Sequence, residues 1–252
     1  MFGIDPLYYV FSLPALLLSM FFSARVKATF DKYSKVRADC GMTGAEAAAT
    51  MLARQGVNDV RIKPVSGFLS DHYNPADNTL NLSPDVYKGR SLAALGVACH
   101  EAGHALQKAT AYRWMGLRTA LVPAANLGSR LSMIVFFVGL ALSGASAEVD
   151  PATGEMVASG GGLGMMLVKT GIVLFSAAVA FSIVTLPVEW DASARAKKAL
   201  VDCGILSFRE ERGAAAVLNA AFMTYIAAAI SSVTTLLYFL VRSGLLGGNR
   251  RR

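Results

Sequence analysis

Residues Leu163–Leu186 read LGMMLVKTGIVLFSAAVAFSIVTL, an apolar run in which Lys169 is the single charge. A membrane-spanning helix needs about 20 mostly apolar residues, so this run is long enough to cross a bilayer. The whole chain has 252 residues, of which 54% are hydrophobic and 16% are charged. A soluble domain carries about 25% charged residues. The composition therefore excludes a disordered chain and favours a membrane protein over a single soluble domain.

Three further stretches are apolar enough to span a membrane: Leu7–Phe22, Leu121–Gly144 and Ala214–Val241. The first is short, but it lacks the basic segment of a signal peptide, because Asp5 is the only charge before Arg25. We interpret it as a retained anchor. Together the four stretches predict about four transmembrane helices.

The charges between these stretches predict their orientation. Residues Ala24–Arg130 hold 14 Lys or Arg against 8 Asp or Glu, whereas Ala145–Gly162 holds three acidic residues and no basic one. Pro187–Gly213 is again basic, with five Lys or Arg. Because basic loops stay in the cytoplasm, the first and third segments are predicted to be cytoplasmic. Four spans would then leave the tail Arg250–Arg252 outside, unless one of the weaker spans does not fully cross.

The first basic segment is long enough for a small domain. Thr43–Glu46 has the pattern of a capping box and opens an Ala-rich helix that ends at Gly56. Val60–Val65, Gly67–Leu69 and Thr79–Leu82 are predicted as extended pieces of a small hairpin, with a turn-rich stretch at 71–78. From Ser91 to about Thr110 the pattern is helical.

This last helix contains His100-Glu-Ala-Gly-His104, an HExxH motif that takes up two of the three histidines of the chain. Histidines at positions i and i+4 lie on one face of a helix, so both imidazoles reach one zinc ion. Glu101 sits beside the metal-bound water and can take its proton. The competing interpretation is a helix whose two histidines face solvent or a polar core.

A zinc hydrolase needs a third protein ligand. The glutamates of the acidic loop are predicted to lie on the other side of the membrane, and Glu210 and Glu211 lie in a loop-like charged run. Glu189 stands at the cytoplasmic end of the third span between apolar residues, where a carboxylate needs a partner. The partner would be zinc or, alternatively, Arg195.

These residues form an ordered set of motifs that resembles the YugP-type bacterial membrane zinc metallopeptidases. The similarity runs from Met42 to Tyr225. The motifs that carry it are Met42–Glu46, Asp71–Pro75, Leu80–Ser83, His100–His104, Leu121–Ser129, Leu186–Ser193 and Val217–Ala221.

The resemblance extends to the HtpX-type gluzincins and implies a catalytic site with named roles. It implies Zn²⁺ as the metal, Glu101 as the base, and the ligands His100, His104 and Glu189. HtpX-type enzymes carry an Asp four residues after the ligand Glu, which orients a ligand His. Here that position is Ser193, so the orienting role would pass to Asp191 or Asn219.

Two residues of the turn-rich stretch are candidates to contact substrate. His72 or Tyr73 would donate to the substrate carbonyl oxygen, on which negative charge develops during hydrolysis. A hairpin edge also commonly pairs with an extended peptide, which would bring the substrate to these residues. The alternative is a turn histidine held by Asp71 or Asn74. Arg195 is a further candidate for substrate contact, against the alternative of a solvated loop arginine.

The expected fold class is mainly α: a membrane helical protein with a small α+β cytoplasmic zincin-like domain that contains a short hairpin. The expected division is an anchor (1–23), the zincin-like segment (24–120), a transmembrane hairpin with an acidic external loop (121–186), a cytoplasmic segment with the third ligand (187–213), and a last helix with a basic tail (214–252).

The expected function is a zinc-dependent endopeptidase of the bacterial inner membrane, with its site facing the cytoplasm. Its partners would be a peptide or membrane-protein substrate and the lipid bilayer, and no nucleic acid, because the net charge of +7 is explained by topology. The alternative is a non-catalytic zinc-binding scaffold or adaptor. A transporter is disfavoured, because Lys169 alone is ionisable deep in a span.

Overall fold

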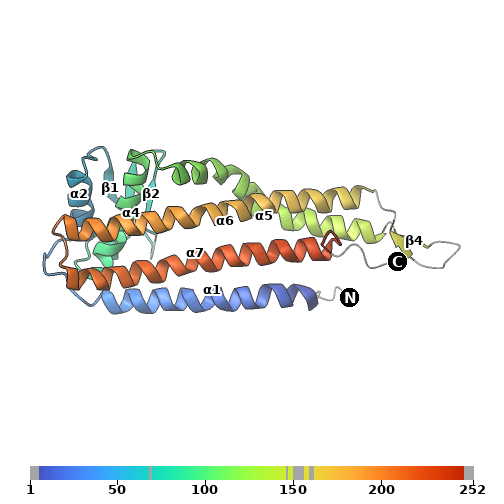
Figure 1. The fold of residues 1–252 in the computed structure, drawn as a ribbon, viewed down its shortest axis with the longest axis horizontal. Helices are drawn as coiled ribbons and strands as arrows, with labels where there is room; N and C mark the ends of the chain where they lie inside the picture. The colour runs from blue at the N-terminus through green and yellow to red at the C-terminus, as the bar shows by residue number, and fades with distance from the viewer. Residues whose placement is uncertain (1–5, 68–69, 146, 150–155, 159–161, 247–252) are drawn as a thin grey trace. The chain divides into compact units, whose positions relative to one another are not determined.

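The computed structural model describes residues 6–67, 70–145, 147–149, 156–158 and 162–246 (Figure 1). Helices make up 76% of the protein, which confirms the mainly α fold class. Four of them are long and apolar enough to cross a membrane, as predicted. They are α1 (Pro6–Tyr33), α5 (Arg113–Ala145), α6 (Leu163–Asp202) and α7 (Phe208–Arg242).

These helices extend beyond the apolar stretches that predicted them. Helix α6 continues through Pro187, because the following residues are good helix formers and a proline inside a long helix is tolerated when neighbouring groups satisfy the freed carbonyl. It ends at Asp202, and Gly204, two residues later, has a φ of 57° that allows Ile205 N–H to bond back to Leu200. Glu210 therefore lies in the first turn of α7, so the loop-like interpretation of its surroundings was wrong.

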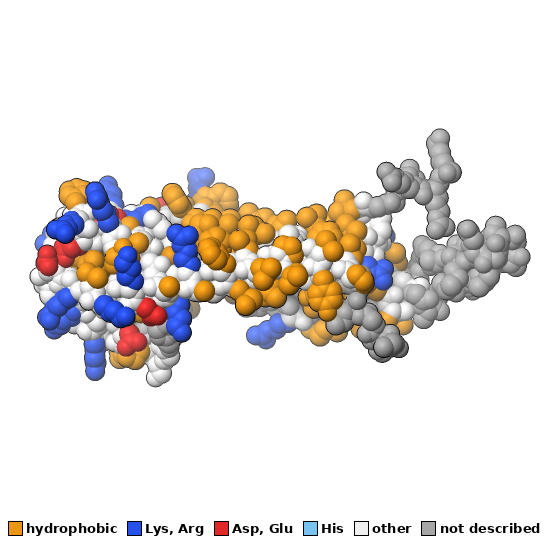
Figure 2. Space-filling model, turned by 90° about the horizontal axis from the view of Figure 1, so that it is seen from below, with side chains coloured by type: hydrophobic (Ala, Val, Ile, Leu, Met, Phe, Trp, Pro, Cys, Tyr) orange, Lys and Arg blue, Asp and Glu red, His pale blue; other side chains and the backbone are white. Residues whose placement is uncertain are grey.

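The chain forms two compact units, and each long helix contributes residues to both. The first unit comprises Met1–Leu17, Thr119–Ile183 and Ala228–Arg252. Its core is aromatic, with the rings of Phe136 and Phe239 stacked at a centroid distance of 4.0 Å. Hydrophobic side chains dominate the outer face of the long helices, as a surface in contact with lipid requires (Figure 2).

The second unit comprises Leu18–Arg118 and Val184–Ala227 and contains the shorter helices α2 (Gly44–Arg54), α3 (Pro84–Tyr87) and α4 (Leu92–Ala109). The predicted capping box is present at the start of α2, and α2 packs on α4. The HExxH motif lies on α4, as predicted.

A three-stranded sheet belongs to the second unit, with strand order β1-β3-β2. The predicted hairpin exists, but its strands are β2 (His72–Asn74) and β3 (Thr79–Leu82), so part of the expected turn is a strand. Strand β1 (Arg61–Pro64) pairs with β3 in parallel, not as a hairpin partner. The structure leaves β2 at an edge of this sheet.

The predicted external loop contains a feature that its composition did not indicate. Two three-residue strands, β4 (Ala147–Val149) and β5 (Met156–Ala158), pair in antiparallel there. Most of the predicted extended piece at 67–69 and the basic tail at 250–252 lie outside the described residues.

Candidate metal centre

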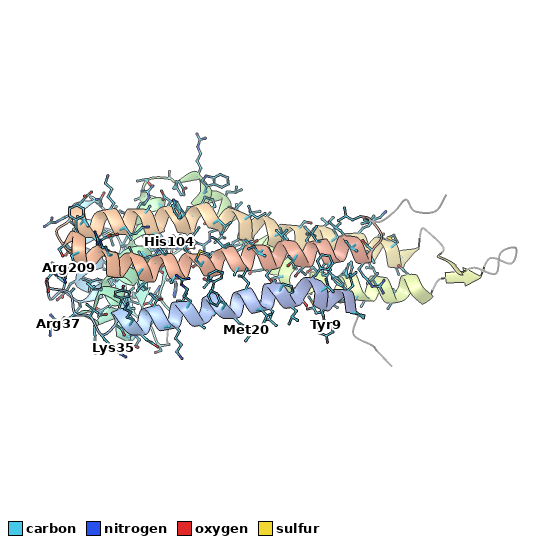
Figure 3. All side chains as sticks on the ribbon, turned by 60° about the horizontal axis from the view of Figure 1, so that its bottom comes forward. Tyr9, Met20, Lys35, Arg37, His104 and Arg209 are labelled. Atoms are coloured by element: carbon cyan, nitrogen blue, oxygen red, sulfur yellow. The ribbon has the colours of Figure 1, made fainter. Side chains whose placement is uncertain are left out.

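Two helices of the second unit bring three metal-binding side chains together. His100 and His104 lie one turn apart on α4, with ring centroids 4.9 Å apart. Figure 3 labels His104. From α6, the Oε2 atom of Glu189 lies 3.2 Å from Nε2 of His100 and 3.5 Å from Nε2 of His104. The three ligating atoms all lie within 4.8 Å of one another, so one ion can contact all of them.

The donor set fits zinc. Two imidazole nitrogens and one carboxylate oxygen are the ligands of catalytic zinc in hydrolases, which keep a further position open for water. Magnesium and calcium sites are built from oxygen ligands instead. Glu189 is only 1% exposed, and a carboxylate buried to that degree needs a cationic partner.

The electrostatics of the centre also favour a cation. Burial by itself lowers the pKa of the His104 imidazole, but the hydrogen bond and negative charge of Glu189 outweigh burial, so the pKa is raised. The site thus stabilises positive charge at this imidazole. Arg118 of α5 lies on the far side of the carboxylate, with Nη2 3.5 Å from Oε1 of Glu189.

A glycine sets the distance between α4 and α6. A Cβ atom on Gly103 would lie 2.6 Å from the backbone oxygen of Ala192, closer than such atoms approach in proteins. The absence of a side chain at Gly103 therefore lets α4 press against α6 at the turn that follows Glu189. Because Gly103 is one of the two central residues of HExxH, the motif supplies this contact as well as two ligands.

Gln107 determines which ring nitrogen of His104 carries the proton. Its amide nitrogen lies 2.7 Å from the carbonyl of Val188 and 2.9 Å from Oδ2 of Asp191, and both of these groups can only accept. The amide oxygen must then face Nδ1 of His104, at 2.9 Å. His104 therefore carries its proton on Nδ1, which leaves the Nε2 lone pair directed at the metal position.

The other histidine, His100, contacts the residue at the position where HtpX-type enzymes carry the orienting Asp, although that role was expected to pass to Asp191 or Asn219. The hydroxyl of Ser193 lies 3.1 Å from Nδ1 of His100. Asp191 reaches the centre through Gln107, and it also accepts from Arg195 at 2.6 Å. Arg195 thus pairs with Asp191, whereas Glu189 pairs with Arg118.

Glu101 lies beside the histidines and is held from a strand. Its Oε2 atom accepts a hydrogen bond of 3.0 Å from the backbone N–H of Tyr73 on β2. The carboxylate lines a cavity of 280 Å³ that also reaches His100 and Glu189. The apolar wall of this cavity is formed by Val26, Val97, Val217, Leu218, Ala221 and Phe222.

Three of the candidate residues lie elsewhere. His72 is exposed, with its ring nitrogens 2.8 Å from the carbonyl of Ser70 and 3.3 Å from the amide of Asn81. The Tyr73 side chain donates to Asn78, and burial raises the pKa of Tyr73 to about 12. Asn219 is exposed and accepts from Lys197.

Gln107, Arg118 and Tyr225 join the centre without having been predicted. Gln107 is fully buried, and Tyr225 lines the cavity from α7. The first could have been suspected, because it lies three residues after His104 on the same helical face. The other two come from helices whose packing the sequence did not indicate.

Comparison with known proteins gives the centre a context. Residues 8–244 match a family described as "Putative neutral zinc metallopeptidase". The chain is 41% identical over 235 residues to the "Putative membrane protease YugP" of Bacillus subtilis, a match that covers 93% of this chain and 96% of that protein. No solved structure matches the chain significantly. Because both matches span nearly the whole sequence, the chain belongs to this family, described as "Putative neutral zinc metallopeptidase".

Proposed function

We propose that the protein is an integral membrane endopeptidase of the gluzincin type, which cuts peptides or membrane proteins at the cytoplasmic face of the bacterial cell membrane. The observation that carries the proposal is the position of Glu101. Its carboxylate shares one cavity with His100 and Glu189, and a backbone N–H holds it in place. A zinc site without catalytic work has no need of a carboxylate there.

His100, His104 and Glu189 would hold the zinc ion. When bound, zinc supplies Lewis-acid chemistry, which makes water a nucleophile at neutral pH and polarises a carbonyl group. The chain contributes the orientation of the ligands: Gln107 fixes the tautomer of His104, and Ser193 contacts the outer nitrogen of His100.

Glu101 would move the proton. Its carboxylate takes a proton from the attacking water as the water oxygen bonds to the carbonyl carbon of the substrate. The same proton is then delivered to the amide nitrogen as the C–N bond breaks, so the products are a carboxylate and an amine. The hydrogen bond from Tyr73 N–H keeps one carboxylate oxygen fixed during both transfers.

Replacing Glu101 with Gln tests this mechanism. Glu101→Gln should lower the rate of hydrolysis of a quenched fluorescent casein by about 10²- to 10⁴-fold, the range for general acid–base catalysis. Zinc content should not change, because Glu101 is not a ligand. Glu211→Gln, the same change at a half-buried residue in the first turn of α7 that does not line the cavity, is the matched control and should leave the rate unchanged.

Three results would count against the proposal. If Glu101→Gln hydrolysed casein at the wild-type rate, Glu101 would not be the base. If this variant lost hydrolysis but kept the cellular function of the wild type, the scaffold alternative would be favoured. Unchanged zinc content in Glu189→Ala would show that Glu189 is not the third ligand.

The cytoplasmic orientation can be tested with a native cysteine. Cys40 is exposed in the second unit, whereas Cys99 and Cys203 are buried. Burial also raises the pKa of the Cys99 thiol, which makes it unreactive. A membrane-impermeant maleimide should therefore label Cys40 in permeabilised cells and not in intact cells. Labelling in intact cells would place the second unit outside.

A further inference from the structure

The cavity that contains Glu101 has two chemically different sides. One side carries polar groups of the metal centre, among them Glu101 and Glu189. The other side is apolar and is built from three helices, because Val26 belongs to α1, Val97 to α4 and Phe222 to α7. The volume of 280 Å³ lies just below the range of about 300–1,000 Å³ that small-ligand pockets occupy. The cavity therefore has room for one or two side chains of an extended peptide.

Packing holds the apolar side in place. Leu218 of α7 is only 2% exposed and belongs to the core of the second unit. The ring of Phe222 packs edge-on against Trp190 of α6, with ring centroids 5.3 Å apart. Because this surface is already ordered, an apolar side chain that docks on it gains burial without the cost of arranging a pocket.

Ala221 leaves the apolar side open. It is the smallest of the apolar side chains that line the cavity, and it lies three residues after Leu218 and beside Phe222 on α7. Residues three apart share one face of a helix, so Ala221 and Leu218 form one continuous surface. A larger residue at position 221 would project into the cavity and take the place of a substrate side chain.

The carboxylates of the cavity already have partners. Asp71 accepts from the backbone N–H of Ser83 at 2.7 Å and from the Ser83 hydroxyl at 3.0 Å. Glu101 accepts from Tyr73 N–H, and Glu189 contacts both histidines. A basic side chain of a substrate would have to compete with these contacts, and an acidic one would be repelled by the three carboxylates. The lining therefore favours an uncharged, apolar side chain.

We propose that the apolar side of this cavity is a subsite for one large apolar side chain, that of a residue adjoining the bond that is cut, and that Ala221 sets the size of the subsite. The proposal rests on the proposed peptidase function, because it takes Glu101 as the place where the bond is cut. The substrates are chains that present a residue of the size of leucine beside that bond. Chains with a charged or small residue there are cut slowly.

The test uses quenched fluorescent peptides that are identical except for one central residue, which is Leu, Ala or Lys. The full chain is loaded with zinc in neutral detergent micelles, and mass spectrometry verifies that cleavage occurs beside the varied residue. Wild type should cut the Leu peptide with a kcat/KM about 10- to 200-fold above that of the Ala peptide, the range for small apolar differences in a pocket. Equal kcat/KM for the Leu and Ala peptides, or a higher value for the Lys peptide, would overturn the subsite.

Ala221→Leu tests the residue that sets the size. Filling the subsite should lower the ratio of kcat/KM between the Leu and Ala peptides by about 10-fold or more. The kcat/KM for the Ala peptide should change little, because this peptide does not need the filled space. Ala228→Leu, the same change at an exposed residue of α7 that does not line the cavity, is the matched control and should keep the wild-type ratio. A wild-type ratio in Ala221→Leu would overturn the role of Ala221.

A second pair of variants decides the question if Ala221→Leu does not fold, which the thermal midpoint and zinc content reveal. Phe222→Ala removes part of the apolar side and should lower the same ratio severalfold. Phe208→Ala makes the same change at a residue of α7 that is 80% exposed, and it should keep the ratio. Equal ratios in these two variants would overturn the subsite.

Binding separates a failure of the subsite from a failure of the peptidase function. Zinc-loaded Glu101→Gln is titrated with the Leu and Ala peptides, and fluorescence anisotropy measures affinity without hydrolysis. If wild type cuts none of the peptides, the peptidase function fails and affinity decides the subsite. Tighter binding of the Leu peptide then supports the subsite, and equal affinity for the two peptides overturns it.

Discussion

Helix α6 meets a glycine of a neighbouring helix in each of the two units. In the second unit, a Cβ on Gly103 would lie 2.6 Å from the oxygen of Ala192. In the first unit, a Cβ on Gly128 would lie 2.2 Å from the oxygen of Leu174. The contacts are alike, since both let two helix backbones approach closely. Their consequences differ, because the contact at Gly103 sets the position of metal ligands and the contact at Gly128 packs two apolar helices.

Among the variants that test this comparison, Gly103→Ala has the largest expected effect. Alanine favours helices more than glycine does, so a loss can be assigned to the clash with Ala192. The clash pushes α6 and Glu189 away from the histidines, and a displacement of about 1 Å can cost about 100-fold in rate. We expect activity to fall by about that factor, with reduced zinc affinity, measured by casein hydrolysis and metal titration.

Gly116→Ala is the matched control, because a Cβ there meets nothing within 4 Å. It should keep both zinc and activity. Normal zinc affinity in a folded Gly103→Ala protein would contradict the role assigned to the close contact.

The next effect is that of Gln107→Met, which keeps the size of the side chain and removes its hydrogen bonds. His104 loses the partner of Nδ1, and Asp191 loses a donor. Loss of such an outer partner typically weakens metal binding by about 10- to 100-fold. Zinc affinity should fall within that range, while Gln55→Met at the exposed end of α2 should have no effect. An unchanged affinity would mean that His104 is oriented by its packing alone.

Gly128→Ala should lower the stability of the protein without changing its zinc affinity. Overpacking a tight contact costs about 1–3 kcal/mol, so the thermal midpoint should fall. Because Gly128 and Leu174 belong to the first unit and no metal ligand does, the folded protein should bind zinc with unchanged affinity. If zinc affinity fell as far as in Gly103→Ala, the division of roles between the two contacts would be wrong.

These variants change helix contacts and hydrogen bonds that were the hardest features to predict from the sequence. The spans follow from apolar run length, and His100, His104 and Glu189 follow from motif spacing and from an acidic residue that needs a partner. Gln107 follows from neither, because an amide has no ligand motif and gains its role only when α6 places Val188 against it. Tyr225 is recruited in the same way, by the packing of α7 beside the cavity.

The limits of the secondary-structure prediction have a similar cause. Strand β2 has only three residues and lies in a turn-rich stretch, so its pairing with β3 decides its conformation. Helix α6 continues past the apolar run because helix formation does not require apolar residues, and its polar continuation packs on α4. In both places tertiary contacts override a local signal.

The smallest effect concerns α2, which packs on α4 and carries no ligand. The backbone N–H of Thr43, followed by its hydroxyl, lowers the pKa of Glu46 from an ordinary value of 4.5. A lowered pKa means that the folded state favours the carboxylate, so this contribution is present above pH 4.5 and disappears as the pH falls through the lowered value. Glu46→Gln keeps an acceptor for the capping box and removes the charge. Its thermal midpoint should therefore lie slightly below that of wild type at pH 7, the difference should vanish below the lowered pKa, and zinc affinity at pH 7 should be unchanged. A difference that does not depend on pH would show that the amide caps the helix less well and that the charge is not what stabilises it.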